Sequence, residues 1–411
     1  MSDTLAKPVH VVFPVGYHDL HPDMNVNFEM NRFYNWVGDD SMLSEMREAA
    51  AGVSDYPTFT KVFLGLGEKA LAQGQALKGA YYLRLAEFFL FTHDPRKLIE
   101  RRRFVDLVLQ YFAVPSSAHS RIPYQSKWLS AYRFSPDKPR GTLVVFGGFD
   151  SYIEEWLPAA MWWRDAGYDT VIFEGPGQGA VLEEALLPMT VHWEQPVKAV
   201  LDFYRLDDVT LMGFSLGGGL VVRAAAFEPR VKRVIAYDIL SDFLDCFLQS
   251  AQPSARQQIL GWLDSKNESA VNDFYRGAMS ASLSADWAMQ QGMHVSGTKT
   301  PYEVLQFCRA YTTADISHLV RQDVLLLCGQ EDHAVPVHQL PDQIATLTSV
   351  RSLTARLFTR AEQAQNHVQT GNMGLAFRVM IEWLDSLDRS NRARRYPRGD
   401  LDHTGSMKSM N

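Results

Sequence analysis

Short apolar runs alternate with amphipathic stretches through the second half of the chain, and turn-forming residues separate them. The runs have the length and the β-branched content of buried strands. Strands that alternate with helices are typical of a parallel sheet covered on both faces. The pattern therefore predicts an α/β fold with a doubly wound, mainly parallel sheet. The predicted strands are 142–146, 169–173, 209–212, 231–237, 324–328 and 353–358, and an amphipathic helix is expected over 373–387.

The N-terminal part of the chain has a different pattern, with apolar residues at helical spacing. Helices are expected over 24–37, 56–74, 75–91 and 95–112. Residues 1–137 are therefore predicted to form a helical lid region that precedes the sheet. The aromatic side chains of this region are expected mainly to pack against one another.

The alternation of strands and helices stops between 241 and 318, which divides the predicted core into 138–240 and 319–388. The inserted segment has helical patterns and many aromatic residues. We interpret it as a cap over the site, in which most aromatic residues build the cap's own core and a few line a pocket for a hydrophobic substrate. Residues 389–411 are rich in Arg, Ser, Gly and Asp and are predicted to be a flexible tail.

The most informative motif is Gly213-x-Ser215-x-Gly217, directly after an apolar run. A serine in the sharp turn between a strand and a helix adopts a strained, positive-φ conformation, which leaves room only for small neighbours. This spacing predicts a nucleophile elbow that exposes the hydroxyl of Ser215. The start of the following helix favours a nearby anionic oxygen, so the amide of Leu216 is a candidate oxyanion donor.

An acid and a base are expected after such a serine, in that order. Asp332 follows the apolar run 324–328 and is the predicted acid. Glu331 beside it is an alternative. Asp238, at the end of the run 231–237, is a second alternative, because it could supply the acid from the preceding strand.

His367 is the predicted base, since it lies in the loop between the last predicted strand and the last predicted helix. It would take the Ser215 proton through one ring nitrogen while Asp332 fixes its tautomer through the other. His333 and His338 also follow the acid, but they are too close to it in sequence to reach across easily.

A second oxyanion donor is expected from the loop after an earlier strand. The run 142–146 ends in Gly147-Gly148-Phe149, where the glycines allow the backbone to turn its amides toward the reacting centre. The amide of Phe149 is therefore the second candidate donor. Losing such a donor typically costs about 3–4 kcal/mol of transition-state stabilisation.

From 141 to 387 the chain resembles the α/β-hydrolase superfamily, and more narrowly its branch with 2,6-dihydropseudooxynicotine hydrolase and the FrsA-type esterases. That branch also has a long helical N-terminal segment. The resemblance implies a Ser-Asp-His triad, here Ser215, Asp332 and His367, and an esterase or a hydrolase of C–C bonds beside ketones. Related serine hydrolases tailor polyketide products. The motifs that carry the resemblance are G-G-F-D-S at 147–151, F-E-G-P-G-Q-G at 173–179, the helix start at 193–197, G-F-S-L-G-G at 213–218 and C-G-Q-E-D at 328–332.

Composition agrees with a globular enzyme, since 46% of the 411 residues are hydrophobic and 21% are charged. A net charge of −7 argues against nucleic-acid binding. No apolar run is long enough to span a membrane, and residues 1–16 lack the pattern of a signal peptide, so a cytoplasmic location is expected. Three scattered cysteines favour neither a disulfide framework nor a metal site. The loop 174–179 lacks the spacing of a nucleotide-binding motif, so no cofactor is predicted.

The sequence therefore predicts a serine hydrolase that forms an acyl-enzyme with a small hydrophobic carbonyl substrate. The bond would be an ester or a C–C bond next to a ketone, in secondary metabolism or catabolism. An alternative of a different class is a non-hydrolytic cyclase or acyltransferase that uses the same serine. A binding protein without activity is the third reading, and the complete triad disfavours it. A homodimer is left open.

Overall fold

The fold is described by a computed structural model for residues 11–91 and 94–395. Within these residues the strands form one sheet in the order β1-β2-β4-β3-β5-β6-β7-β8. β1 and β2 pair antiparallel, and β4, β3 and β5 to β8 run parallel to one another. The predicted doubly wound, mainly parallel sheet is confirmed. The strands are β1 (His119–Tyr124), β2 (Lys127–Phe134), β3 (Thr142–Phe146), β4 (Asp169–Glu174), β5 (Val209–Phe214), β6 (Val231–Tyr237), β7 (Asp323–Gly329) and β8 (Ser352–Phe358).

Alternating residues of the central strands are buried on the two faces of the sheet. Val145 and Ile172 pack on the face covered by α6 and α16. Val144 and Leu211 pack on the face covered by α8 and α9. Because both faces are buried, the strands read as continuous apolar runs. The helices of this layer are α6 (Leu157–Asp165), α7 (Gly179–Glu183), α8 (Glu194–Tyr204), α9 (Gly217–Phe227), α15 (Gln339–Thr346) and α16 (Met373–Arg395).

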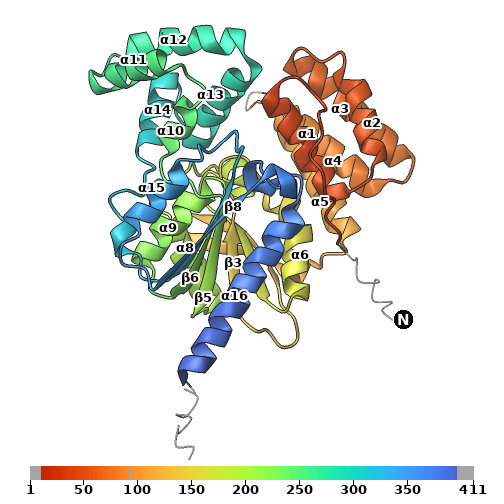
Figure 1. Cartoon of the computed structure of the whole chain (residues 1–411). Helices are drawn as coiled ribbons and strands as arrows, with labels where there is room; N and C mark the ends of the chain where they lie inside the picture. The colour runs from red at the N-terminus through yellow and green to blue at the C-terminus, as the bar shows by residue number, and fades with distance from the viewer. Residues whose placement is uncertain (1–10, 92–93, 396–411) are drawn as a thin grey trace, which may run out of the picture.

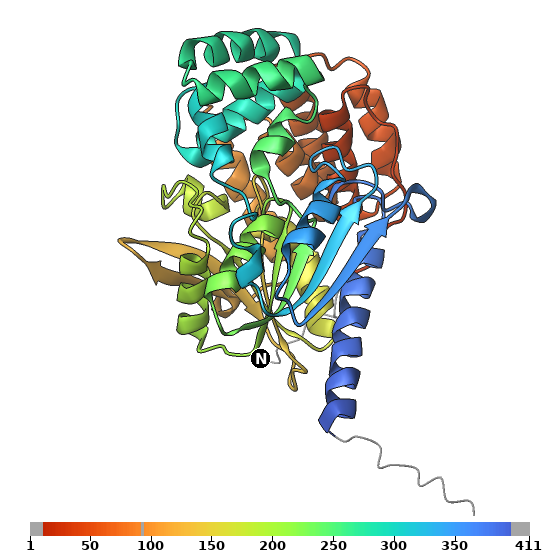
Figure 2. The ribbon, with the colours of Figure 1, turned by 60° about the vertical axis from the view of Figure 1, so that its left-hand side comes forward.

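Two further groups of helices lie side by side over one end of the sheet (Figures 1 and 2). This is the end at which β3, β5 and β7 finish, so loops that follow these strands lie beneath both groups. The N-terminal group is α1 (Met24–Val37), α2 (Ser41–Ala50), α3 (Tyr56–Ala72), α4 (Ala76–Phe88) and α5 (Arg96–Tyr111). The inserted group, between β6 and β7, is α10 (Phe243–Leu248), α11 (Pro253–Asp264), α12 (Glu268–Ala281), α13 (Leu283–Ser296) and α14 (Pro301–Arg309).

Helix α1 is buried between the sheet and the other N-terminal helices. Its first turn is capped by the side chain of Asp23, which accepts hydrogen bonds from the amides of Asn25 and Val26. It ends at Gly38, whose φ of 69° is the left-handed conformation that favours glycine at this position. The two caps fix the register of α1, which in turn places Phe28 and Arg32 against the loops at the end of the sheet.

Three sequence predictions need correction. The region 1–137 is not helical throughout, because 119–134 form the hairpin β1–β2 that extends the sheet. Helix α2 was missed. The predicted tail 389–411 begins too early, because α16 continues to Arg395; the remainder lies outside the described residues. Across 11–91 and 94–395, no helix combines the length and the apolar content needed to cross a membrane.

Five short 3-10 turns complete the described chain. Two of them matter for the site, because η2 follows the loop of Phe149 and η5 carries His367. They are η1 (Ser116–Ala118), η2 (Ile153–Trp156), η3 (Ser317–Leu319), η4 (Arg360–Glu362) and η5 (His367–Gln369).

Candidate active site

The turn between β5 and α9 has the geometry that the glycine spacing predicts. Ser215 has a φ of 61°, and its amide donates to the carbonyl of Tyr237. A Cβ atom on Gly213 would lie 2.0 Å from the carbonyl oxygen of Gly217, so only glycine fits there. The tight turn leaves the side chain of Ser215 half-buried at the end of the sheet.

The structure brings the predicted serine, base and acid together in one chain of hydrogen bonds. The imidazole Nε2 of His367 lies 2.8 Å from Oγ of Ser215, and Nδ1 lies 2.7 Å from Oδ2 of Asp332. The other oxygen of Asp332 accepts hydrogen bonds from the amides of Ala334 and Val335, at 2.7 and 2.9 Å. These bonds orient the carboxylate toward the imidazole, which leaves Nε2 free to accept a proton from the serine.

The charges around the imidazole favour its protonated form. Burial by itself lowers the pKa of His367, but the carboxylate of Asp332 outweighs burial and raises the pKa to about 9. Burial likewise favours the neutral form of Asp332, yet its bond to His367 keeps the pKa of Asp332 below the ordinary value. The pair is therefore suited to stabilise an imidazolium that forms during a reaction.

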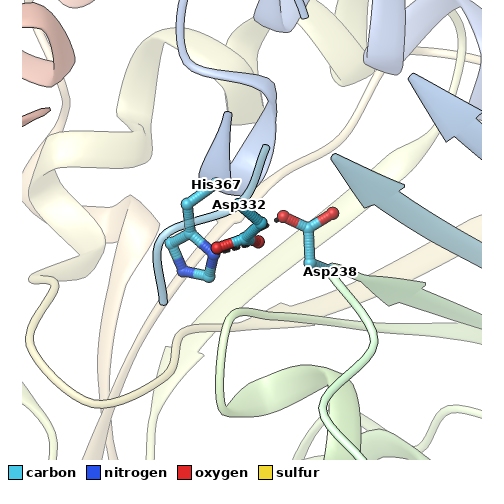
Figure 3. Close-up of side chains that lie close together, drawn as sticks. All are labelled: Asp238, Asp332 and His367. Carbon is cyan, nitrogen blue, oxygen red and sulfur yellow. Dashed lines mark hydrogen bonds and ion pairs between the residues drawn. The ribbon is translucent and has the colours of Figure 1, made fainter. Parts of the chain in front are cut away.

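The two alternatives for the acid have different places. Glu331 is exposed and forms an ion pair with Arg360, away from the imidazole. Asp238 is fully buried, and its Oδ2 lies 3.5 Å from Nδ1 of His367. Figure 3 shows both carboxyl groups beside the imidazole. His333 does not bond to Ser215; its ring lies 4.5 Å from Phe28, and burial lowers the pKa of His333 to about 4.

The two predicted oxyanion donors meet beside Ser215. A Cβ on Gly148 would lie 2.8 Å from the amide nitrogen of Leu216, so the loop before Phe149 touches the elbow closely. Among the described residues, neither the amide of Leu216 nor that of Phe149 has a protein acceptor. Both N–H groups are therefore available to an oxygen bound at Ser215.

Sequence reasoning missed Gln178, which orients this loop. Its Nε2 donates to the carbonyl oxygens of Gly147 and Gly148, at 2.7 and 3.0 Å. The C=O of Gly148 and the N–H of Phe149 belong to one planar trans peptide and point in opposite directions. The hydrogen bond from Gln178 to the C=O of Gly148 therefore turns the N–H of Phe149 away from Gln178. The only sequence signal was the glycine-rich loop 174–179, whose spacing argued against a nucleotide-binding motif.

A pocket open to solvent lies next to Phe149, with about 340 Å³ of empty space when the adjoining solvent is included. Ser215 does not line it, so the pocket adjoins the predicted oxyanion donor rather than the hydroxyl itself. Its walls come from the N-terminal helices, from the loops after β3 and β4, from α7 and from α13. Its lining mixes aromatic and amide side chains with charged ones, namely Phe88, Phe149, Trp287, Gln178, Gln291, Arg84, Lys97, Asp150 and Glu183.

The cover of the site is tied to the loop of Phe149 by buried charges and by direct bonds. The guanidinium of Arg32 in α1 pairs with Asp150 and Glu155, at 3.0 and 2.6 Å. Gln291 in α13 donates to the carbonyl of Phe149 at 3.0 Å. Both helical groups therefore contact the segment that carries a predicted oxyanion donor.

A single group of side chains has the donor atoms for a metal ion within the described residues. Asp238, Asp332 and His367 each offer one ligand atom, and these atoms lie within 4.8 Å of one another. The Nδ1 of His367 already bonds to Asp332 at 2.7 Å, which is the arrangement of a hydrogen bond.

Comparison with known proteins assigns the chain to a family. A family model described as "alpha/beta hydrolase fold" matches residues 165–358. The chain is 29% identical over 289 residues to the hydrolyase poxO of Penicillium oxalicum, covering 63% of this chain and 68% of poxO. It is 27% identical over 415 residues to the hydrolase LUC6 of a Fusarium species, covering 90% and 97%. The chain is a hydrolase of the α/β-hydrolase superfamily.

The superfamily fold is also seen in a solved structure. The crystal structure of 2,6-dihydroxy-pseudo-oxynicotine hydrolase is similar to this hydrolase with a TM-score of 0.57 and 21% sequence identity. The match covers 83% of this chain and 91% of that one, so it includes helices outside the sheet. The resemblance inferred from the motifs is confirmed at the level of the superfamily and its fold.

Proposed function

We propose that this α/β-hydrolase is a serine hydrolase in which Ser215, His367 and Asp332 form the catalytic triad. The observation that carries the proposal is the continuous chain of hydrogen bonds from Oγ of Ser215 through the imidazole to the carboxylate. No other hydroxyl in the described residues has a histidine and a carboxylate aligned in this way with a strand-to-helix turn.

In the first step Oγ of Ser215 attacks the carbonyl carbon of the substrate, and its proton passes to Nε2 of His367. Asp332 keeps the proton on Nδ1 and stabilises the positive charge of the ring. The developing oxyanion is held by the amides of Leu216 and Phe149. His367 then returns the proton to the leaving oxygen, or to the leaving carbon where a C–C bond next to a ketone is broken.

In the second step water attacks the acyl-enzyme, with His367 again acting as the base, and Ser215 is released. The proposed substrate is a small hydrophobic carbonyl compound. Aromatic side chains of the inserted helices support this, since Phe243, Phe247 and Trp287 all contact Phe149 with ring centroids 5.2, 6.0 and 6.2 Å apart. The bond is an ester or a C–C bond beside a ketone.

The helices that cover the site favour a second candidate function. Phe28 of α1 lies 5.9 Å from the ring of His367, and Gln291 of α13 donates to the carbonyl of Phe149, so helices of both groups border the site. A cover of this kind would limit the entry of water. A cyclase or acyltransferase would use the same Ser215, but an internal nucleophile would replace water. The predicted cytoplasmic location, the role in secondary metabolism or catabolism, and the homodimer stay predictions.

Acyl esters and β-diketones, tested in water labelled with heavy oxygen, would distinguish these candidates. A hydrolase incorporates one labelled oxygen in the acid product, and Ser215→Ala abolishes the turnover. A product without the label that still depends on Ser215 would favour the cyclase or acyltransferase. Turnover that is unchanged in Ser215→Ala would contradict both.

A further inference from the structure

The carboxyl group of Asp238 is fully buried beside the proposed triad, and the steps above do not use it. It follows β6, while Asp332 follows β7. Its Oδ2 lies 3.5 Å from Nδ1 of His367, against 2.7 Å for Oδ2 of Asp332. One ring N–H therefore faces two carboxyl groups, and the nearer one accepts its hydrogen bond (Figure 3).

The hydrogen-bond donors around the two carboxyl groups are unequal. Asp332 accepts from the imidazole and from the amides of Ala334 and Val335. Asp238 accepts from the amide of Val368 at 2.6 Å and from Nε2 of Gln369 at 2.8 Å. Three donors, one of them an imidazole next to a charge, stabilise an anion better than two. The negative charge therefore belongs on Asp332.

No other cation compensates a second charge. Within the described residues, the only ion pairs of Asp238 and Asp332 are with His367. Asp150 is further out and is paired with Arg32. Burial disfavours the charged form of the other titratable groups around the pair, because it raises the pKa of Tyr237, Cys246 and Cys328 and lowers that of His333.

Two buried carboxylates beside one imidazole would repel each other strongly, and a shared proton removes that repulsion. We propose that Asp238 is a neutral carboxylic acid that keeps its proton and donates a hydrogen bond to Asp332, and that it acts as a positioning residue for the general base His367. The inference rests on the proposed function, since it assumes that His367 is the base. In agreement, burial and the charge of Asp332 raise the pKa of Asp238 well above its ordinary value.

Asp238 also anchors the turn that carries the base. Val368 and Gln369, directly after His367, have φ values of 43° and 47°, which are strained for residues with a side chain. The bonds from both residues end on Asp238, and the hydroxyl of the preceding Tyr237 donates to the carbonyl of Val368. The end of β6 thus holds η5 in the conformation that points the imidazole toward Ser215.

The proton on Asp238 has a consequence for the chemistry. A neutral acid that donates to Asp332 adds a fourth hydrogen bond to that carboxylate and lowers its basicity. The proton of the imidazole then stays on Nδ1, and the pKa of His367 is lower than it would be beside two ionised carboxylates, so the ring is less readily held in its charged form. An ionised Asp238 would instead add a second negative charge and hold His367 in its charged form.

Infrared spectroscopy tests the protonation state without reference to activity. The difference spectrum of wild type minus Asp238→Asn, at neutral pH, is expected to show the C=O stretch of one protonated carboxyl group, shifted in heavy water. The same spectrum against Asp332→Asn identifies bands of the ionised partner. A difference spectrum that shows only the bands of a carboxylate for Asp238 would overturn the proposal, whether or not the proposed function holds.

The pH profile tests the positioning role. Asp238→Asn replaces one neutral group by another, so the acid limb of kcat/KM is expected to stay within about 0.3 pH units and kcat to fall less than about tenfold. If Asp238 were ionised in the wild type, Asp238→Asn would remove a negative charge and lower the pKa of the acid limb by about one unit or more. Asp238→Ala, which removes the anchor as well, is expected to lower kcat about a hundredfold with little change in KM.

Two results keep this inference separate from the proposed function. Activity that persists in Ser215→Ala would end the proposed function but would leave the infrared result intact. A divalent metal in stoichiometric amount in the purified wild type, lost from Asp238→Ala, would mean that a cation rather than a proton joins the two carboxylates, and would overturn the inference while Ser215 stays reactive.

Discussion

Phe88 in α4 stacks on Trp287 in α13, with ring centroids 5.0 Å apart and an angle of 11° between the ring planes. The contact joins the N-terminal helices to the inserted helices, although about two hundred residues separate the two side chains in the sequence. Trp287 also meets the ring of Phe149 edge-on, at 6.2 Å. The two helical groups thus close over the site through one aromatic contact next to a proposed oxyanion donor.

Trp287→Ala is expected to open this contact. A bulky fluorophosphonate should then modify Ser215 at least severalfold faster, while a small one reacts at nearly the wild-type rate. The rate constants of modification are measured for both reagents. Trp262→Ala is the matched control, because Trp262 also lies in the inserted helices but packs on Phe274. Equal acceleration in the two variants would show that loosening the insertion, and not the stacking on Phe88, controls access.

Asp332→Asn is expected to lower kcat by about 10³- to 10⁴-fold, because the amide no longer holds the correct tautomer of His367. Glu331→Gln serves as the control and should retain nearly full activity, since Glu331 pairs with Arg360 on the surface. Steady-state kinetics of both variants with one substrate give the comparison. A large loss in Glu331→Gln together with an active Asp332→Asn would assign the acid to the neighbouring residue.

Gln178→Ala is expected to lower kcat by about ten- to a hundredfold with a smaller change in KM. The oxyanion develops only as the bound substrate reacts, so its donors stabilise the transition state and not the substrate complex. The amide of Gln178 fixes the carbonyls of Gly147 and Gly148. Gln178→Glu should be at least as inactive, since a carboxylate would repel those carbonyl oxygens. A change confined to KM would place Gln178 in substrate binding instead.

The acid limb of kcat/KM is expected above the ordinary histidine pKa of 6.5 and no higher than about 9. His367 must be neutral to accept the serine proton, and the carboxylate of Asp332 raises its pKa. The same shift affects folding: the stabilisation from this pair is complete below pH 6.5 and is lost as pH rises through about 9. A limb below pH 6.5 in the wild type would disagree with the charged environment described here.

Glu29 gives a prediction for stability. Burial outweighs Arg32 and raises the pKa of Glu29 from 4.5 to about 8, so the folded protein holds a proton that the unfolded chain releases. Its contribution to stability is therefore complete below pH 4.5 and is lost as pH rises through about 8. Over that pH range the Tm of Glu29→Gln should fall less than the Tm of wild type, and the two falls should differ by about 2 °C or more. Parallel Tm curves would contradict a protonated Glu29.

Much of the fold could be predicted because local patterns determine it. β3 and β6 have the predicted bounds, since each is a buried apolar run that ends in turn-forming residues. The hairpin β1–β2 was missed because its residues, H-S-R-I-P-Y and K-W-L-S-A-Y-R-F, are largely polar or mixed. Its pairing depends on β4, to which β2 is antiparallel.

The positions of Ser215, Asp332 and His367 followed from motif spacing and chain order. The roles of Gln178 and Asp238 did not, because each depends on contacts between segments far apart in the sequence. A sequence shows Asp238 only as an alternative acid at the end of a strand. The unequal sharing of hydrogen-bond donors between two buried carboxyl groups needs the folded structure.

The central claim is that His367 activates Ser215. The most direct measurement is the intact mass of the protein after reaction with a fluorophosphonate, for wild type, Ser215→Ala, His367→Ala and His338→Ala. One adduct is expected on wild type and on His338→Ala, whose histidine is exposed and pairs with Asp245, and none on the other two variants. An adduct that persists on Ser215→Ala, or no adduct on either folded wild type or the opened Trp287→Ala variant, would contradict the claim.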